Sequence, residues 1–407
     1  MKWFFAFAYL LSLSPSALAD LAQPQIGALS GAPTKEWTFL LYLNGNNNLD
    51  SFGKMNLNQM EVVGSNESVN LVTQWASIAN GDVRRMLIQK DNDTATVTSP
   101  VVQNMGSVDM GSDKSLEDFI RWGITQYPAK HYFVAVWDHG SGWHARINDV
   151  LAGTAHPTDI SWDDNTGHSI TTKQLGAVMG RVSQWLGRKI DIYGSDACLM
   201  GMAEVAGEMK DSVAYFVGSQ EVEPGAGWPY TDFLAPLAAN PTMTAHDLSA
   251  LLAKTYAASY DGGSNGTQGV TMASYDMAKY NAVRDAAQKL GTQIAKMPTA
   301  ALAKVFAAAN ASQSFEYNDY VDFGDFLKHL SALDIREIDA KVIDQAKTAL
   351  KDFVITSNNT GIYNASTGAS IWIPKDKASL ATYLATYETL VWDSETKWSR
   401  ALSAFVN

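Results

Sequence analysis

The sequence predicts an α/β fold in which helices cover both faces of a mostly parallel central sheet. Short apolar runs of strand length recur between Trp37 and Gly218. They are apolar along their whole length rather than at alternate positions, which is typical of strands buried on both faces. Helical patterns separate several of these runs, and strands that alternate with helices favour a parallel sheet.

The predicted elements follow one another regularly up to about residue 240. Strand-like runs cover residues 37–43, 70–75, 84–89, 131–137, 189–193 and 215–218, and helical patterns cover residues 115–127, 171–186 and 199–209. Beyond this point the chain is rich in alanine and mostly helical, with strand-like stretches at residues 269–274 and 369–374. We therefore expect a core over residues 36–240 and a C-terminal part, residues 241–407, that completes the sheet and adds a helical cap.

The N-terminal residues predict export. Lys2 precedes an apolar run, and a small-residue pattern that ends at Ala19 is followed by Asp20, which is typical of a cleavable signal peptide. The run is too short to span a bilayer comfortably. We expect residues 1–19 to be a signal peptide cleaved after Ala19 and residues 20–35 to be a flexible lead-in. The mature protein is then secreted or periplasmic and free of the membrane.

Composition restricts the classes of partner. With 46% hydrophobic residues and 12 tryptophans, the chain can build a sizeable core. Its formal net charge of -12 disfavours nucleic acids and anionic lipids and favours cationic partners. An exported chain with 1 cysteine cannot form an internal disulfide, so the thiol is buried and inert, exposed and oxidisable, or used in chemistry. The sequence leaves the oligomeric state undefined.

Two strand ends carry residues with reactive side chains. The stretch VAVWDHGSGW, residues 134–143, delivers His139 into a glycine-containing turn, and the stretch IDIYGSDAC, residues 190–198, ends at Cys198. In an open parallel sheet, ligands and reacting groups gather where strands end and helices begin. If the two strands are neighbours joined by the helix over residues 171–186, His139 and Cys198 emerge on the same edge.

A thiol and an imidazole placed in this way can perform nucleophilic catalysis. A thiol attacks as a thiolate, which a helix N-terminus and an imidazolium both stabilise, and we expect the helix that starts near Leu199 to act in this way. Imidazole can then protonate a departing amine, and backbone N–H groups beside a glycine such as Gly140 can hold an oxyanion. Strand alternation directs Asp138 away from His139, so we predict a dyad rather than a triad. The alternative is a structural cysteine beside an incidental turn histidine.

At these residues the sequence resembles the clostripain family of cysteine peptidases, within the clan that has the caspase-like fold. The resemblance covers roughly residues 37–375, and it is specific because its motifs occur together, in family order, with the single cysteine at the nucleophile position. It implies a caspase-like α/β/α sandwich with residues 36–240 as the catalytic core. The matching segments are FLLY (39–42) with the asparagine-rich turn through Asp50, WDHGSGW (137–143), DACLMGMAE (196–204), GSQEVEP (218–224) and GWPY (227–230), with weaker matches at DFGD (322–325) and GASIW (368–372).

The resemblance also implies roles for individual residues. His139 would be the catalytic base and acid, Cys198 the nucleophile that forms a thioester acyl-enzyme, and the backbone N–H groups of Gly140 and Cys198 the oxyanion hole. Members of the family typically cut after Arg or Lys, using an acidic residue two positions before the nucleophile, which is Asp196 here. A carboxylate is a natural partner for a guanidinium. A turn-capping Asp196 is the alternative.

The segment that follows the second strand end is expected to wall a substrate groove. Over residues 219–230, Ser219 would pair with substrate backbone and Trp228 would pack on the substrate. The alternative is a well-packed loop rich in Pro and Gly.

Two further expectations come from properties of the family. Members are often activated by cleavage in the loop after the catalytic histidine, and Arg146 is the candidate position for self-processing. Some members require calcium, although the sequence itself requires no cofactor and defines no metal site. Oxygen ligands for calcium could come from Asp159, Asp163 and Asp164, but their spacing matches no EF-hand and an acidic surface loop is the alternative.

We therefore expect a secreted cysteine endopeptidase that acts on peptides or proteins with basic residues. Two alternatives remain open. One is a non-catalytic binding protein of the same fold. The other is a transpeptidase that uses the same dyad, because hydrolysis and transfer pass through the same acyl-enzyme.

Overall fold

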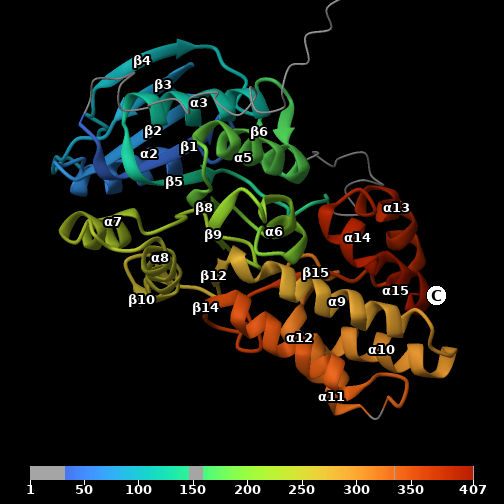
Figure 1. Ribbon diagram of the computed structural model, residues 1–407. Helices are drawn as coiled ribbons and strands as arrows, with labels where there is room; N and C mark the ends of the chain where they lie inside the picture. The colour runs from blue at the N-terminus through green and yellow to red at the C-terminus, as the bar shows by residue number, and fades with distance from the viewer. Residues whose placement is uncertain (1–32, 146–158, 334, 407) are drawn as a thin grey trace, which may run out of the picture.

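The central element of the molecule is a 9-stranded sheet with the strand order β14-β12-β9-β8-β5-β1-β2-β3-β4 (Figure 1). The computed structural model describes residues 33–145, 159–333 and 335–406. The strands of the sheet are β1 (Lys35–Gly45), β2 (Val69–Ser77), β3 (Asp82–Leu87), β4 (Val101–Gly106), β5 (Ala129–Trp137), β8 (Ile190–Asp196), β9 (Val213–Gly218), β12 (Thr271–Asp276) and β14 (Val354–Asn359).

The middle of this sheet is parallel. Strand β1 pairs in parallel with β2 and β5, and β8 pairs in parallel with β5 and β9. Antiparallel strands flank this group, with β3 and β4 beyond β2 and with β12 and β14 beyond β9. The predicted mostly parallel sheet is therefore confirmed.

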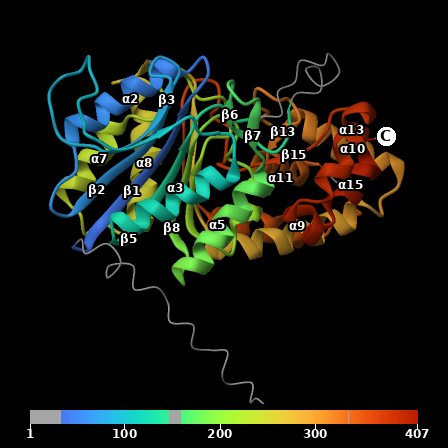
Figure 2. The ribbon, with the colours of Figure 1, turned by 90° about the horizontal axis from the view of Figure 1, so that it is seen from above.

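Helices cover both faces of the sheet, as Figure 2 shows for α2, α7 and α8 on one side and α3 and α5 on the other. The helices that flank the sheet are α2 (Asp50–Val63), α3 (Asp113–Gln126), α5 (Thr172–Leu186), α6 (Ala203–Met209), α7 (Tyr230–Ala239) and α8 (Ala245–Ser259). Successive side chains of β1 point to opposite faces of the sheet and so contribute to the hydrophobic core on each face. Leu40 and Tyr42 belong to the core under α3 and α5. Phe39 and Leu41 belong to the core under α2 and α7. The predicted α/β/α sandwich is confirmed.

Helix α5 connects the two strands that lead to the reactive residues. Its N-terminus is fixed by a capping box between Thr171 and Gln174, and it ends at Gly187 in the left-handed conformation, φ 75°. The chain then enters β8, which lies beside β5 as predicted.

The C-terminal residues add a helical lobe beyond β12 and β14, drawn in orange and red in Figure 1. Its elements are the 3-10 helix Met277–Lys279 and the helices α9 (Tyr280–Ile294), α10 (Thr299–Ala311), α11 (Phe323–Ala332), α12 (Ala340–Phe353), α13 (Lys377–Tyr387), α14 (Val391–Thr396) and α15 (Trp398–Phe405). The predicted helical C-terminal extension is therefore confirmed.

One strand-like stretch lies elsewhere than in the central sheet. Residues 369–374 contain β15 (Ser370–Trp372), which pairs with β13 (Tyr320–Asp322) in a separate two-stranded sheet. Two further small sheets pair β6 (Ile160–Asp163) with β7 (His168–Ile170), and β10 (Asp261–Gly263) with β11 (Gly266–Thr267).

Candidate active site

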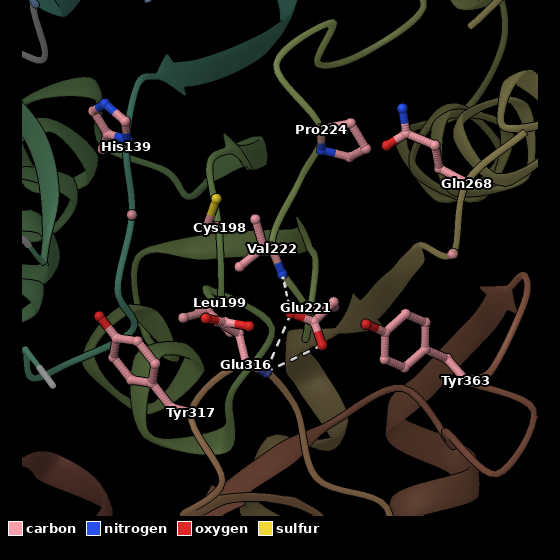
Figure 3. A pocket seen from close by; sticks show the side chains of 12 residues that line it. His139, Cys198, Leu199, Glu221, Val222, Pro224, Gln268, Glu316, Tyr317 and Tyr363 are labelled. Carbon is pink, nitrogen blue, oxygen red and sulfur yellow. Dashed lines mark hydrogen bonds between the residues drawn. The ribbon is translucent and has the colours of Figure 1, made fainter. Parts of the chain in front are cut away.

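The structure brings His139 and Cys198 to the same edge of the sheet. Trp137 and Asp196 are directly opposite each other where β5 and β8 end, and Asp138 donates its backbone N–H to the Asp196 carbonyl over 3.2 Å. His139 and Cys198 therefore follow at matching positions, and both border the same two cavities. Figure 3 shows the imidazole and the thiol on facing sides of one opening.

The imidazole is held by a residue that the sequence interpretation missed. His139 Nε2 lies 2.7 Å from Asn48 Oδ1, in the turn that follows β1. A carbonyl oxygen only accepts hydrogen bonds, so this contact places a ring proton on Nε2. The signal was present in the sequence, because Asn48 lies in the asparagine-rich turn at the end of the neighbouring strand.

Asp138 belongs to a buried network of asparagines behind this histidine. Its carboxylate accepts hydrogen bonds from Asn44 Nδ2 at 3.1 Å and from Asn47 Nδ2 at 2.6 Å. Burial raises its pKa well above the usual value. The carboxyl group thus ties the end of β5 to the end of β1, which fixes the backbone that carries His139.

The thiol of Cys198 is half-buried against the segment that follows β9. Glu223 donates its backbone N–H to Sγ over 3.3 Å, and the Glu223 carbonyl lies 3.9 Å from Sγ. Burial raises the pKa of the thiol to about 12, and the carboxylates of Glu223 and Glu221 add to the increase, while the backbone N–H groups of Glu223 and Gly140 oppose it. The thiol is therefore protonated in the free protein.

Gly140 is required by close packing against the nucleophile. A Cβ atom at this position would lie 2.5 Å from the Cys198 carbonyl oxygen and 3.1 Å from the Cys198 nitrogen. Only a residue without a side chain lets these two backbone segments lie so close. The Gly140 and Cys198 backbones are thus adjacent, as an oxyanion hole made from both would require.

The expected helix start near Leu199, directly after Cys198, is wrong. Helix α6 begins at Ala203, and the chain between them turns through Leu199, which has φ 64°. Leu199 is held in this turn by its N–H, which donates to the Glu221 carbonyl over 3.2 Å. The thiol therefore lacks the helix N-terminus that was expected to acidify it, in agreement with its raised pKa.

A small cavity lies beside the thiol and ends at two carboxyl groups. Its volume is about 160 Å³, and its lining includes His139, Asp196, Cys198, Glu223 and Gly227. This is far below the ~300–1,000 Å³ of sites for drug-sized ligands, so it admits one side chain. Gly227, with φ 62°, leaves room for the Asp196 carboxyl, because a Cβ there would lie 3.0 Å from Oδ1.

Asp196 is buried at the end of this cavity. Its Oδ2 accepts a hydrogen bond from the Tyr230 hydroxyl at 2.6 Å and lies 3.4 Å from the Trp228 backbone nitrogen, which also donates to it. Burial raises the pKa of Asp196 to about 7, while the hydrogen bond from Tyr230 opposes the shift. The carboxyl group therefore borders the same small cavity as the Cys198 thiol.

A larger and more open cavity lies on the other side of the thiol. Its volume is about 680 Å³, and Figure 3 shows Glu221, Glu316, Tyr317 and Tyr363 around it. The Glu221 carboxylate accepts the backbone N–H of Glu316 and so joins the loop after β9 to the C-terminal lobe. This cavity is large enough for several residues of an extended peptide.

Two predicted substrate contacts lie in the interior. Trp228 is 0% exposed and packs its ring against Gly194 and Phe133 in the core, so it cannot pack on a substrate. Ser219 is also 0% exposed, and its hydroxyl bonds with Thr271 Oγ1 at 3.0 Å and with the Glu221 carbonyl. Both residues shape the loop that forms the cavity walls, and neither lines them.

The three aspartates considered for calcium do not form a cation site. Asp159 is buried and accepts the backbone N–H of Thr172, Asp163 accepts the backbone N–H of Met110, and Asp164 is exposed. Across the three described ranges, no group of three or more His, Cys, Asp or Glu side chains is arranged to hold a metal ion. The self-processing candidate Arg146 and the signal peptide lie outside the described residues.

The fold and these strand ends define the class of the protein, an α/β/α sandwich of the caspase-like type with a cysteine and a histidine at adjacent strand ends. The chain belongs to the clostripain family, whose family model matches residues 41–405. Clostripain from Hathewaya histolytica is 31% identical over 128 residues. That alignment covers 30% of this chain and 23% of clostripain, so the match spans less than a quarter of the relative's length.

Solved structures share the fold. A secreted C11 cysteine protease from Bacteroides thetaiotaomicron, in complex with an irreversible peptide inhibitor, matches with a TM-score of 0.69 and 20% identity, over 89% of this chain and 99% of that chain. An inactive zymogen C11 protease from Parabacteroides distasonis matches with a TM-score of 0.69 and 18% identity, over 90% and 99% of the two chains.

Proposed function

We propose that the chain is an exported cysteine endopeptidase that cleaves peptide bonds after arginine or lysine, with Cys198 as nucleophile and His139 as general base and acid. The observation that carries this proposal is the matched position of the two residues beyond Trp137 and Asp196, beside a one-residue cavity that ends at a carboxyl group. Membership of the clostripain family supports the same reaction.

Because the thiol is protonated in the free protein, its proton must be transferred when sulfur attacks the substrate. Because burial holds the thiol proton in the free protein, His139 Nδ1 takes up that proton as sulfur attacks the scissile carbonyl. The C–N bond then breaks, the imidazolium returns the proton to the leaving amine, and a thioester remains on Cys198. Water hydrolyses the thioester in the second half of the cycle. The backbone N–H groups of Gly140 and Cys198 are the donors proposed for the oxyanion.

The small cavity supports the preference for a basic residue before the cut. A guanidinium or ammonium at its end would meet the Asp196 carboxyl in a water-poor setting, where charge-assisted hydrogen bonds are strong. A neutral side chain would leave this buried carboxyl without a cation.

Export and self-processing belong to the same proposal. The signal-like N-terminal residues support export. Within the described ranges, no helix combines the length and the apolar character that crossing a membrane requires. Cleavage after Arg146 would follow from the same specificity. Incubating the wild type beside Cys198→Ala and measuring intact mass tests it, because processing should occur only in the wild type, and equal masses would contradict it.

The activity is tested with fluorogenic peptides that end in Arg, Lys, Asp or Leu. We expect turnover of the Arg and Lys peptides by the wild type and none by Cys198→Ala. Turnover that survives the substitution would contradict the mechanism. Binding of basic peptides without turnover by the wild type would instead support the non-catalytic alternative, and transfer to an added peptide amine would support a transpeptidase.

A further inference from the structure

A second carboxyl group lies in the small cavity, and the peptidase mechanism leaves it unused. Glu223 is 8% exposed, and neither of its carboxyl oxygens has a hydrogen-bond partner of ordinary geometry among the residues that the structure describes. Its backbone N–H donates a hydrogen bond to the Cys198 thiol, while its side chain lines the cavity together with Asp196. The polar groups nearest to it are the Asp196 carboxyl, the Ala197 backbone N–H and the Tyr256 hydroxyl, and a buried carboxyl placed in this way carries a desolvation cost that needs an explanation.

Asp196 is the group that faces Glu223 most directly. Burial and the charge of Asp196 raise the pKa of Glu223 well above its usual value, whereas a hydrogen bond from the Glu223 carboxyl favours the ionised form of Asp196. Asp196 uses its Oδ2 for the Tyr230 hydroxyl and the Trp228 N–H, which leaves Oδ1 for its neighbour. Two neighbouring carboxyl groups that line one buried cavity cannot both be ionised at low cost, and a shared proton resolves the conflict.

Among the residues that the structure describes, no Lys or Arg side chain lines this cavity. The thiol of Cys198 follows β8, and the carboxylate of Glu221 lies in the loop after β9. Hydroxyl groups come from Tyr230 in α7, from Tyr256 in α8 and from Tyr260 directly after α8. The end of β5 contributes Asp138, whose carboxyl is bonded to asparagines, and His139, which borders the cavity mouth. A cation must therefore arrive with the substrate.

We propose that Asp196 and Glu223 form one binding site for a basic side chain, that the free pair holds a single shared proton, and that this proton leaves to solvent when a guanidinium or ammonium enters. The inference rests on the proposed function, and it adds Glu223 as a second specificity-determining residue. Below the pKa of the free pair, binding then exchanges one positive charge for another, so the cavity does not hold two uncompensated carboxylates. A neutral isostere cannot displace the proton.

The proposal predicts that basic substrates bind with release of a proton. Between the pKa of the free pair and the lower pKa of the occupied pair, each fall of one pH unit should weaken binding of an arginine peptide about tenfold. Burial raises the pKa of Asp196 to about 7, and burial together with the Asp196 charge raises the pKa of Glu223 well above its usual value, so the upper end of this range lies at or above neutral pH. Above that pH the free pair is already ionised and the release should disappear.

The test is calorimetry on the full chain carrying Cys198→Ala, which prevents turnover. A blocked tripeptide amide that ends in arginine, and its citrulline isostere, are titrated in two buffers of different ionisation enthalpy. We expect the arginine peptide to release about one proton near pH 6.5 and none near pH 9. The citrulline peptide, with affinity measured by competition, should release none at either pH.

Variants separate a role in recognition from a role in folding. Glu223→Gln should reduce the ratio of arginine to citrulline affinity at least tenfold, and Glu223→Asp should retain part of the ratio and of the proton release. Glu204→Gln is the matched control, because Glu204 is also a buried carboxyl with a pKa raised to about 7, but it binds Trp372 N and the Tyr387 hydroxyl away from this cavity. It should preserve both readouts.

The outcomes distinguish the two proposals. One outcome would contradict the shared proton only: the wild-type cavity prefers arginine, no proton is released, and Glu223→Gln keeps the ratio of arginine to citrulline affinity. The proposed peptidase specificity would then still stand. Equal affinity for the arginine and citrulline peptides would overturn both. If Glu223→Gln does not fold, the proton count of the Cys198→Ala protein and of its Glu223→Asp derivative still decides the question.

Discussion

Replacing Asn48 by alanine removes the hydrogen bond that fixes the ring of His139. The bond joins His139 Nε2 and Asn48 Oδ1 over 2.7 Å. A hydrogen bond between neutral groups contributes about 0.5–1.5 kcal/mol, and one to a charged group about 1.5–3 kcal/mol. In the proposed mechanism, the ring is neutral before attack and becomes imidazolium as it takes up the thiol proton. Only the difference, about 1–1.5 kcal/mol, lowers the barrier, and it corresponds to roughly a tenfold change in rate.

Asn48→Ala should therefore lower kcat about tenfold and leave KM within about twofold, because the bond strengthens only after the substrate is bound. The assay is initial-rate hydrolysis of a fluorogenic arginine peptide, with active enzyme counted by titration with an irreversible arginine-based inhibitor. Asn48→Asp keeps an oxygen acceptor and should recover most of the rate.

Asn104→Ala is the matched control. Asn104 lies on the exposed edge strand β4, away from the site, and its side chain donates a hydrogen bond to Asp82. A kcat for Asn48→Ala within twofold of the wild type would refute the orienting role. Equal losses in Asn48→Ala and Asn104→Ala would also refute it.

Three further substitutions test the site and the core. Gly140→Ala places Cβ 2.5 Å from the Cys198 carbonyl oxygen and should lower kcat/KM by about 10²-fold or more, because it displaces an oxyanion donor. Gly180→Ala is the control: no atom lies within 4 Å of its Cβ, so kcat/KM should be unchanged. Trp228→Ala should destabilise the fold by about 3–5 kcal/mol in urea unfolding, and a loss no larger than that of the half-buried Trp185→Ala would contradict the core position of Trp228. Burial raises the pKa of Glu204 from 4.5 to about 7. The protonated side chain therefore makes its full contribution to the free energy of unfolding below about pH 4.5, and this contribution is lost as the pH rises through 7. The loss amounts to at most ~3 kcal/mol. Glu204→Gln should therefore gain stability relative to the wild type between pH 5 and pH 8, and a constant difference in melting temperature over that range would contradict this sign.

The parallel part of the sheet could be predicted because its strands are buried on both faces. Their sequences are apolar throughout, as in β1 and β5, and such runs are recognisable without any knowledge of the fold. The edge strand β14 was not predicted, because its sequence VITSNN is mostly polar and half-buried. Residues 369–374 have the apolar character of a strand, but sequence does not say which sheet a strand joins, and β15 pairs with β13.

The site could be predicted only where strand direction defines it. The meeting of His139 and Cys198 follows from adjacent parallel strands, whereas the start of α6 depends on the left-handed Leu199, which sequence alone does not reveal. Asn48 and Glu223 were missed because their positions depend on how the turn after β1 and the loop after β9 approach the two strand ends. The aromatic Trp228 was assigned to a substrate contact, although its size suited the core equally well.

The most direct measurement is covalent capture of the nucleophile by a blocked peptide that ends in an arginine chloromethyl ketone, followed by intact mass and peptide mapping. The account predicts one adduct, on the Cys198 sulfur, which is absent in Cys198→Ala and forms far more slowly in His139→Ala and with the citrulline analogue. An adduct at another residue, or equal labelling rates in the wild type and His139→Ala, would contradict the pairing of thiol and imidazole at this edge of the sheet.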